Sequence, residues 1–87
     1  MSVNIHYFKT HPEPFEAVLL GNKRHEVRRD DRAVRPRVGD LLILQEWRPT
    51  PGTKEGDYTG REVKKRVTYV TDPGTWGIPD SVYVMSI

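Results

Sequence analysis

A run of large apolar side chains, Leu41-Leu42-Ile43-Leu44, stands out in a chain of 87 residues of which only 36% are hydrophobic. Together with the residues up to Trp47, this run fits a β-strand, and its lack of polar alternation predicts that both faces are buried. The weaker strands of the chain must therefore be arranged around it so that sheet edges are hidden. The run is far too short to cross a membrane, which takes about 20 apolar residues.

The rest of the chain predicts further strands and one helix. Pro12 and Pro14 suit a helix start, the apolar spacing that follows suits a helix over residues 13–20, and Gly21 suits its end. Residue alternation predicts four more strands, over residues 3–9, 23–29, 62–71 and 82–87. These segments predict one α+β domain over residues 1–87, mostly β. We expect a small, partly closed barrel of about five strands with one short helix after the first strand.

The chain contains no cysteine, which excludes disulfide scaffolds, zinc fingers, iron–sulfur sites and thiol nucleophiles. Its three histidines, His6, His11 and His25, match no metal-ligand spacing, so we expect no metal and no cofactor. We expect these histidines to be structural residues whose ring nitrogens are hydrogen-bonded. Acid–base catalysis in a cleft is the alternative. The N-terminus lacks an apolar signal core, which favours a cytoplasmic protein without a membrane partner.

Charge is unevenly distributed along the chain, although the formal net charge is only +2. Residues 23–37 hold seven basic and three acidic side chains, a net +4, and residues 61–66 add a net +3. The remainder of the chain is therefore at −5. Such segregation suits a polyanionic partner, but charged strands of a small domain that simply face solvent give the same pattern. The sequence leaves open whether the two basic segments meet.

The segment from Gly21 to Arg28 carries the most informative pattern. Arg24, Glu26 and Arg28 share one face of the expected strand, whereas Lys23 faces the opposite side from Glu26 on a flat strand. A bulge, or a strand that starts after Lys23, would bring the Lys23 and Glu26 side chains together. Because this segment contributes little apolar surface, a role in the core explains it poorly.

Here the chain resembles the ASCH domain of the PUA-like superfamily and, more narrowly, a short bacterial and phage family of unknown function within it. The resemblance rests on Gly21-x-Lys23-x-x-Glu26-x-Arg28 followed by Val38-Gly39-Asp40 and an apolar strand. Further matching pieces cover nearly the whole chain in the right order: His6, Phe15-Glu16-Ala17-Val18, Asp31-Arg32, Gln45-Glu46-Trp47 and Tyr58-Thr59-Gly60-Arg61.

The resemblance implies a PUA-like β-barrel with the helix beside a cleft lined by Lys23, Glu26 and Arg28. It also implies RNA binding or recognition of a modified base. Some ASCH members resemble small amidohydrolases acting on acylated cytidine, in which the motif lysine works with a threonine and a later glutamate. Glu26 stands where those enzymes carry the threonine.

Three functional hypotheses follow. The first is a module that binds RNA, or a modified base or nucleotide, through a basic cleft. Its candidate binding residues are Lys23, Arg24, Glu26, Arg28, Arg29, Arg32, Trp47 and Trp76. The tryptophans are candidate stacking platforms, although Trp47 also suits a core or rim position. The second is a nucleoside amidohydrolase with Lys23 as catalytic amine and Glu26 as general acid–base. The third is a phage or host regulatory domain that binds a protein through the loop over residues 49–57.

Overall fold

The computed structural model describes residues 2–87. Its elements, in chain order, are β1 (Ile5–Thr10), α1 (Pro12–Leu19), β2 (His25–Arg29), β3 (Leu41–Pro49), β4 (Gly56–Arg66), β5 (Tyr69–Thr71) and β6 (Val82–Ser86). The protein is thus mostly β with one short helix, as expected. Over the residues described, no helix is both long and apolar enough to cross a membrane.

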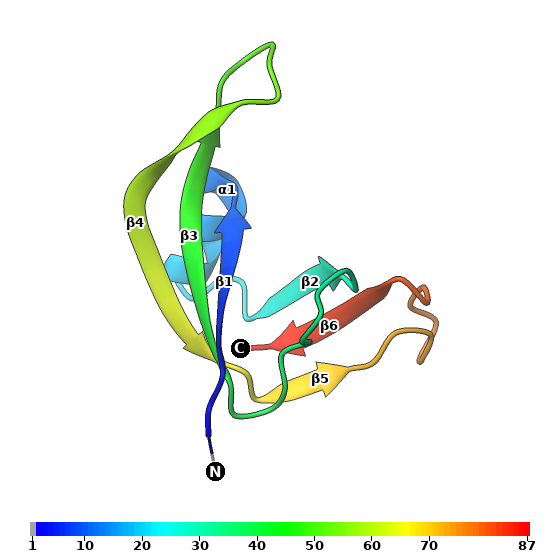
Figure 1. Ribbon diagram of the computed structural model, residues 1–87. Helices are drawn as coiled ribbons and strands as arrows, with labels where there is room; N and C mark the ends of the chain where they lie inside the picture. The colour runs from blue at the N-terminus through cyan, green and yellow to red at the C-terminus, as the bar shows by residue number, and fades with distance from the viewer. Residues whose placement is uncertain (1) are drawn as a thin grey trace.

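The strands form two three-stranded sheets (Figure 1). In the first, β3 lies between β1, which runs parallel to it, and the antiparallel β4. In the second, β6 lies between β2 and β5, and both pairs are antiparallel. The central place of β3 agrees with its apolar run, because Leu42 and Leu44 are fully buried and Ile43 is 4% exposed.

Two expectations need correction. Within residues 2–87 the strands close no barrel, and there are six of them, not about five. The segment over residues 62–71, expected as one strand, is divided between β4 and β5. The chain leaves the first sheet at Val67, which is buried and whose backbone bonds Gly39 and Asp40, and enters the second sheet. Alternation continues through this crossing, so the pattern alone does not reveal it.

The core lies where α1 and the two sheets meet. It consists of Phe8, Phe15, Val18, Leu42, Leu44, Val67, Tyr83 and Met85. The helix packs against β3 and β4 and contributes Phe15 and Val18. Pro12 opens it, as expected, since the first helical turn needs no N–H from that position. Gly21 follows its end at φ +80°, a conformation that glycine adopts without strain.

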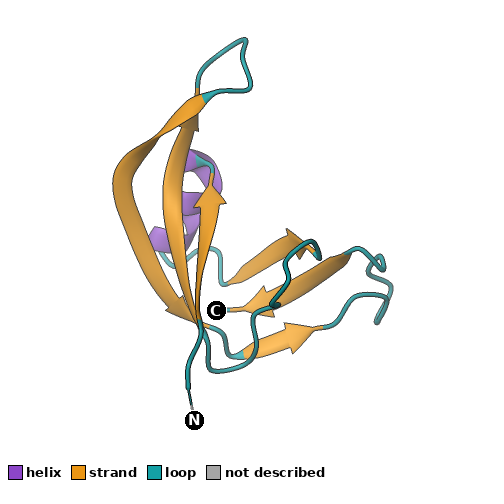
Figure 2. Ribbon diagram, in the orientation of Figure 1, coloured by secondary structure: helices purple, strands orange, loops and turns teal. Residues whose placement is uncertain are grey.

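Two loops extend from this frame. The connection over residues 30–40 passes across the second sheet before it enters β3 (Figure 2). The loop between β3 and β4 projects beyond the first sheet (Figure 2). It is shorter than expected, because Pro49 and Gly56 still pair as strand residues.

Candidate functional site

A cavity of about 300 Å³ lies at the end of β1, between the start of α1 and β2. Its walls include Thr10, His11, Pro14, Lys23, Glu26 and Arg28. Small-molecule sites begin at about this volume and use a few convergent polar groups on a shaped wall. Three of the residues that the motif singled out therefore line one hollow.

Lys23, Glu26 and Arg28 are held together by short polar contacts. Lys23 Nζ lies 2.9 Å from Glu26 Oε2, and Arg28 Nη2 lies 3.6 Å from Glu26 Oε1. The β2 strand begins only at His25, so Lys23 is outside the strand alternation and reaches the inner face where Glu26 lies. The turn after α1 fixes this geometry, because the backbone N–H groups of Asn22 and Lys23 both donate to Ala17 O.

Glu26 is the most unusual member of the site. It is 3% exposed, and Oε1 accepts no hydrogen bond from residues 2–87. The Nε of Arg28 is likewise buried and without a partner in the described chain. A buried polar group without a hydrogen bond costs about 1–3 kcal/mol, so such a group calls for an explanation. One explanation is a ligand whose polar atoms complete the pairing.

Two arginine side chains connect the second sheet to the first across the seam between β2 and β1. Arg28 Nη1 donates to Lys9 O at 3.1 Å, and Arg32 Nη2 donates to Tyr7 O at 2.6 Å. Both guanidinium groups also lie over the ring of Phe8, at 4.7 Å for Arg28 and 3.8 Å for Arg32. Arginine side chains, and not a neighbouring strand, thus bind these two carbonyl groups at the edge of β1.

The other predicted binding residues divide into three groups. Trp47 lies beside the cavity, because its ring is 4.2 Å from Lys9 Nζ and 5.5 Å from the His11 ring. Arg24 and Arg29 are exposed on the surrounding surface. Trp76 is 90% exposed in the loop between β5 and β6, away from the cavity.

The second basic segment, over residues 61–66, contacts the chain just beyond the end of the first. Arg66 Nη1 donates to Gly39 O at 2.8 Å, which joins the end of β4 to the end of the loop over residues 30–40. At the other end, Arg61 is bound to Glu46 and Glu16, on the β4 side of the first sheet. Residues 61–66 therefore run along β4 and do not line the cavity.

Several residues with defined roles escaped the sequence reading. Thr10 lines the cavity and accepts a bond from Arg28 Nη2 at 3.2 Å. Tyr83 lies opposite Arg28 in the β2–β6 register, is fully buried, and its hydroxyl has no partner in residues 2–87. Burial raises the pKa of Tyr83. Only the pairing of β2 with β6, which local pattern does not specify, places Tyr83 beside the motif.

Two of the segments that matched the ASCH pattern, Gln45-Glu46-Trp47 and Tyr58-Thr59-Gly60-Arg61, bind each other. Glu46, which is buried, accepts hydrogen bonds from Arg61 and from Thr59, and Arg61 also donates to Glu16 on α1 at 2.8 Å. The bond from Arg61, followed by that from Thr59, lowers the pKa of Glu46 from 4.5 to about 2 against the opposing effect of burial. The network ties α1 to β3 and β4.

His6 and Asp40 form a second buried polar pair, with Nε2 and Oδ2 2.9 Å apart. Burial raises the pKa of Asp40, but hydrogen bonds from His6 and from the backbone N–H groups of Arg37 and Asn4 outweigh it and leave the pKa lowered. His6 is thus a satisfied structural residue that joins β1 to the residue before β3. His25 is exposed on β2.

Acid should destabilise the protein through these carboxylates. The folded pKa of Glu46 is below its ordinary 4.5, so its stabilising effect is present above that pH and is lost as pH falls toward about 2. The lowered pKa of Asp40 acts in the same direction. We expect the free energy of unfolding to fall as the pH is lowered from about 4.5 to about 2, and Glu46→Gln to make this dependence on pH weaker. Urea unfolding at each pH measures the free energy of unfolding.

Glu55→Gln in the β3–β4 loop is the matched control and should keep the wild-type slope, because Glu55 is exposed. Carboxyl NMR titration of the unmodified protein gives the pKa of Glu46 directly. An ordinary value near 4.5 would contradict the expectation.

Comparison with known proteins identifies relatives of this chain. A family model described as "Domain of unknown function (DUF3850)" matches residues 5–87. A protein of Escherichia phage P2, described as an uncharacterized 12.9 kDa protein in the GpA 3′ region, is 43% identical over 76 residues. The match covers 87% of this chain and 62% of the phage protein, so the chain spans less than two thirds of that relative's length.

Proposed function

We propose that this chain, which belongs to the DUF3850 family, binds single-stranded nucleic acid, RNA in particular, by taking one base into the cavity beside Glu26. Glu26 accepts a hydrogen bond from an exocyclic amino group of the base. Lys23 and Arg28 supply positive charge toward the adjoining phosphates. Trp47 and His11, at the margin of the cavity, offer ring faces to a neighbouring base.

The observation that carries the proposal is the buried, incompletely hydrogen-bonded carboxylate of Glu26 between two cations. An ionised carboxylate only accepts hydrogen bonds, so it pairs with amino-bearing bases and rejects a base that presents a carbonyl there. Lys23 and Arg28 place two positive charges beside this carboxylate, in a buried position where an unpaired charge would be costly.

The resemblance of residues 21–28 to the ASCH motif is a second line of support. The PUA-like superfamily is associated with RNA binding and with modified bases, and kinship with it is part of the proposal. The basic charge over residues 23–37 favours the same class of ligand. Several arginines of that segment also hold the fold together, so the proposal places specificity in the cavity and not in a broad basic patch.

Base preference tests the proposal most directly. We expect short cytidylate RNA to bind more tightly than uridylate RNA of equal length, by about 5- to 150-fold, as for one well-made base contact. Glu26→Gln should remove most of this preference, because an amide both donates and accepts. Fluorescence anisotropy at several salt concentrations measures it, and affinity should fall as salt rises.

Glu55→Gln serves as the control, since it removes an equal charge from an exposed loop. It should keep the cytidylate preference. Equal affinity for the two RNAs in the wild-type protein, or a preference that persists in Glu26→Gln, would overturn the assignment of Glu26. No binding at low salt would overturn the function as a whole.

Hydrolysis of an acylated nucleoside is the second candidate function for the same cavity. The specific observation in its favour is the 2.9 Å pairing of the Lys23 ammonium with the Glu26 carboxylate at the cavity wall. Incubation with N-acylated cytidine followed by chromatography measures turnover. Turnover abolished by Lys23→Ala supports it, and no turnover, or turnover unaffected by that change, removes it.

A further inference from the structure

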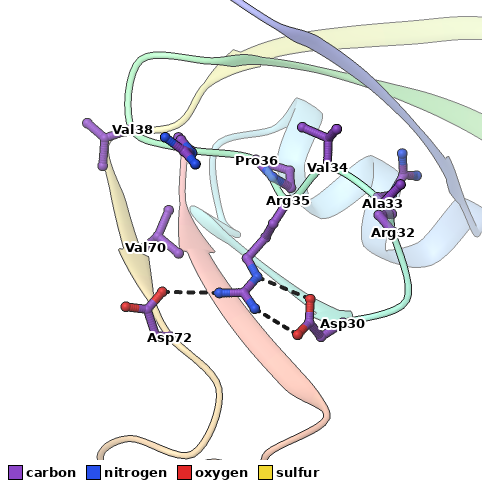
Figure 3. A pocket seen from close by; sticks show the side chains of 10 residues that line it. Asp30, Arg32, Ala33, Val34, Arg35, Pro36, Val38, Val70 and Asp72 are labelled. Carbon is purple, nitrogen blue, oxygen red and sulfur yellow. Dashed lines mark hydrogen bonds and ion pairs between the residues drawn. The ribbon is translucent and has the colours of Figure 1, made fainter.

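A second, larger hollow of about 740 Å³ lies beneath the loop over residues 30–38 (Figure 3). The loop forms one side, and Val70 and Asp72, at the end of β5, form the other. The hollow is separate from the cavity at Glu26, since the two share no lining residue. Arg32, which bridges the seam to β1, lines the hollow and lies over the same Phe8 ring as Arg28, a residue of that cavity.

Arg35 crosses the hollow in an unusual way. Its Nε and Nη2 donate to the two oxygens of Asp30 at 3.1 and 2.7 Å, and its Nη1 donates to Asp72 at 3.4 Å. All three guanidinium nitrogens are therefore engaged by carboxylates in the plane of the group. The pairing with Asp30 raises the pKa of Arg35. Asp30 follows β2 and Asp72 follows β5, so the guanidinium spans the second sheet.

Three of the five N–H donors of Arg35 are thereby engaged, and the flat faces of the guanidinium carry no hydrogen bond. One side of Arg35 lies toward the Tyr83 ring, whose centroid is 5.5 Å from Cζ. The Arg35 side chain is nevertheless 36% exposed, and in Figure 3 the broad side of its guanidinium is seen between Asp30 and Asp72, in front of β6. Guanidinium planes are surfaces on which nucleobases stack.

The surroundings of Arg35 suit a base attached to a phosphate. Val34, Val38 and Val70 supply apolar walls, and Val34 and Val38 are more than half exposed. Arg35 alone pairs with both aspartates of the hollow. Arg37 is exposed, and its side chain forms no ion pair or hydrogen bond within residues 2–87. A positive charge therefore remains for a phosphate beside an apolar slot.

We propose that this hollow is a second nucleotide subsite, in which a planar base stacks on Arg35 and the adjoining phosphate contacts Arg37. The inference rests on the proposed function and extends it. A bound strand crosses the arginine-bridged seam, with one base at Glu26 and a later base at Arg35. The ligand is thus a strand of several nucleotides, and a single nucleotide engages only part of the site.

The test compares cytidine monophosphate with a cytidylate tetranucleotide RNA in NMR titrations of the whole protein. We expect Arg35→Lys, which keeps the charge but loses the planar fork, to weaken tetranucleotide binding by about 5- to 150-fold, the effect of one stacked base. The affinity for the monophosphate at Glu26 should stay within about twofold. Arg48→Lys, at an exposed arginine of β3, is the matched control and should leave both affinities unchanged.

A direct readout does not depend on the variant's folding. In the unmodified protein, a base stacked on Arg35 should shift the Nε–H proton of Arg35 upfield when the tetranucleotide is added, whereas a phosphate contact alone gives no ring-current shift. An unmoved Nε–H signal, or tetranucleotide affinity unchanged in Arg35→Lys, overturns the subsite. In that case a cytidylate preference that still depends on Glu26 leaves the proposed function standing. Failure of the wild-type protein to bind either probe overturns both.

Discussion

Replacing Arg28 by alanine is expected to lower the free energy of unfolding by about 2–4 kcal/mol. Hydrogen bonds that involve a charged group are worth about 1.5–3 kcal/mol, and a cation over an aromatic ring adds about 0.5–2. Arg28 bonds Lys9 O and Thr10, lies over the Phe8 ring, and is one of two cations at Glu26. Because only 23% of the Arg28 side chain is exposed, water can replace few of these contacts when the side chain is removed. Urea unfolding measures the change.

The neighbouring residue provides the control. Arg29 is exposed on the other face of β2, and its side chain forms no hydrogen bond or ion pair with any residue that the structure describes. Arg29→Ala should therefore stay within about 0.5 kcal/mol of the wild type. Arg28→Lys, which keeps the charge and loses the fork, should fall between the two. Equal stability of the Arg28→Ala and Arg29→Ala proteins would show that guanidinium bridges do not hold the sheets together.

Leu44→Ala is expected to cost about 2–5 kcal/mol, the usual effect of removing a fully buried leucine side chain. Leu44 is 0% exposed on the central strand β3, where it pairs with Phe8 of β1 and Val63 of β4. Small domains are stable by only about 5–15 kcal/mol, so this single change takes much of the total. Thermal unfolding followed by circular dichroism measures it, alongside urea titration.

Leu20→Ala is the matched control for the same deletion of atoms. Leu20 follows α1 and is 66% exposed, so its truncation should change stability by no more than about 0.5 kcal/mol. Similar losses for the two leucines would mean that β3 is not the centre of the core. The contrast tests the burial of Leu44 in the core independently of any ligand.

The elements with strong local signals were predictable. The apolar run of β3 predicted a strand buried on both faces, and the proline-led pattern placed the helix within one residue of its observed bounds, Pro12–Leu19. Signals of this kind are local, because burial and helix ends depend on neighbouring residues. The division of residues 62–71 between β4 and β5 has no local signal in the sequence. It depends on which sheet each half pairs with, and the same alternating sequence suits either.

The candidate site was predictable to a similar extent. The motif named Lys23, Glu26 and Arg28, and these three line one cavity. It did not indicate that Arg32 is bound to the backbone of β1. Nor did it indicate that Arg35 is bound to Asp30 and Asp72. Their charge suggested contact with phosphate, and much of it instead joins distant segments. Linear charge counts cannot distinguish these uses, because the partners are as many as 37 positions away.

By itself, the sequence determined that this is a mostly β chain built on one buried strand, with a lysine, a glutamate and an arginine closely spaced after its only expected helix. Each of these facts follows from interactions between residues a few positions apart. The tertiary structure alone decided that the strands divide into two sheets, that guanidinium groups bridge the seam between them, and that Glu26 lies buried with an incomplete set of hydrogen bonds. Those outcomes depend on which distant strand edges meet, and edge pairing is decided by the packing of the whole chain.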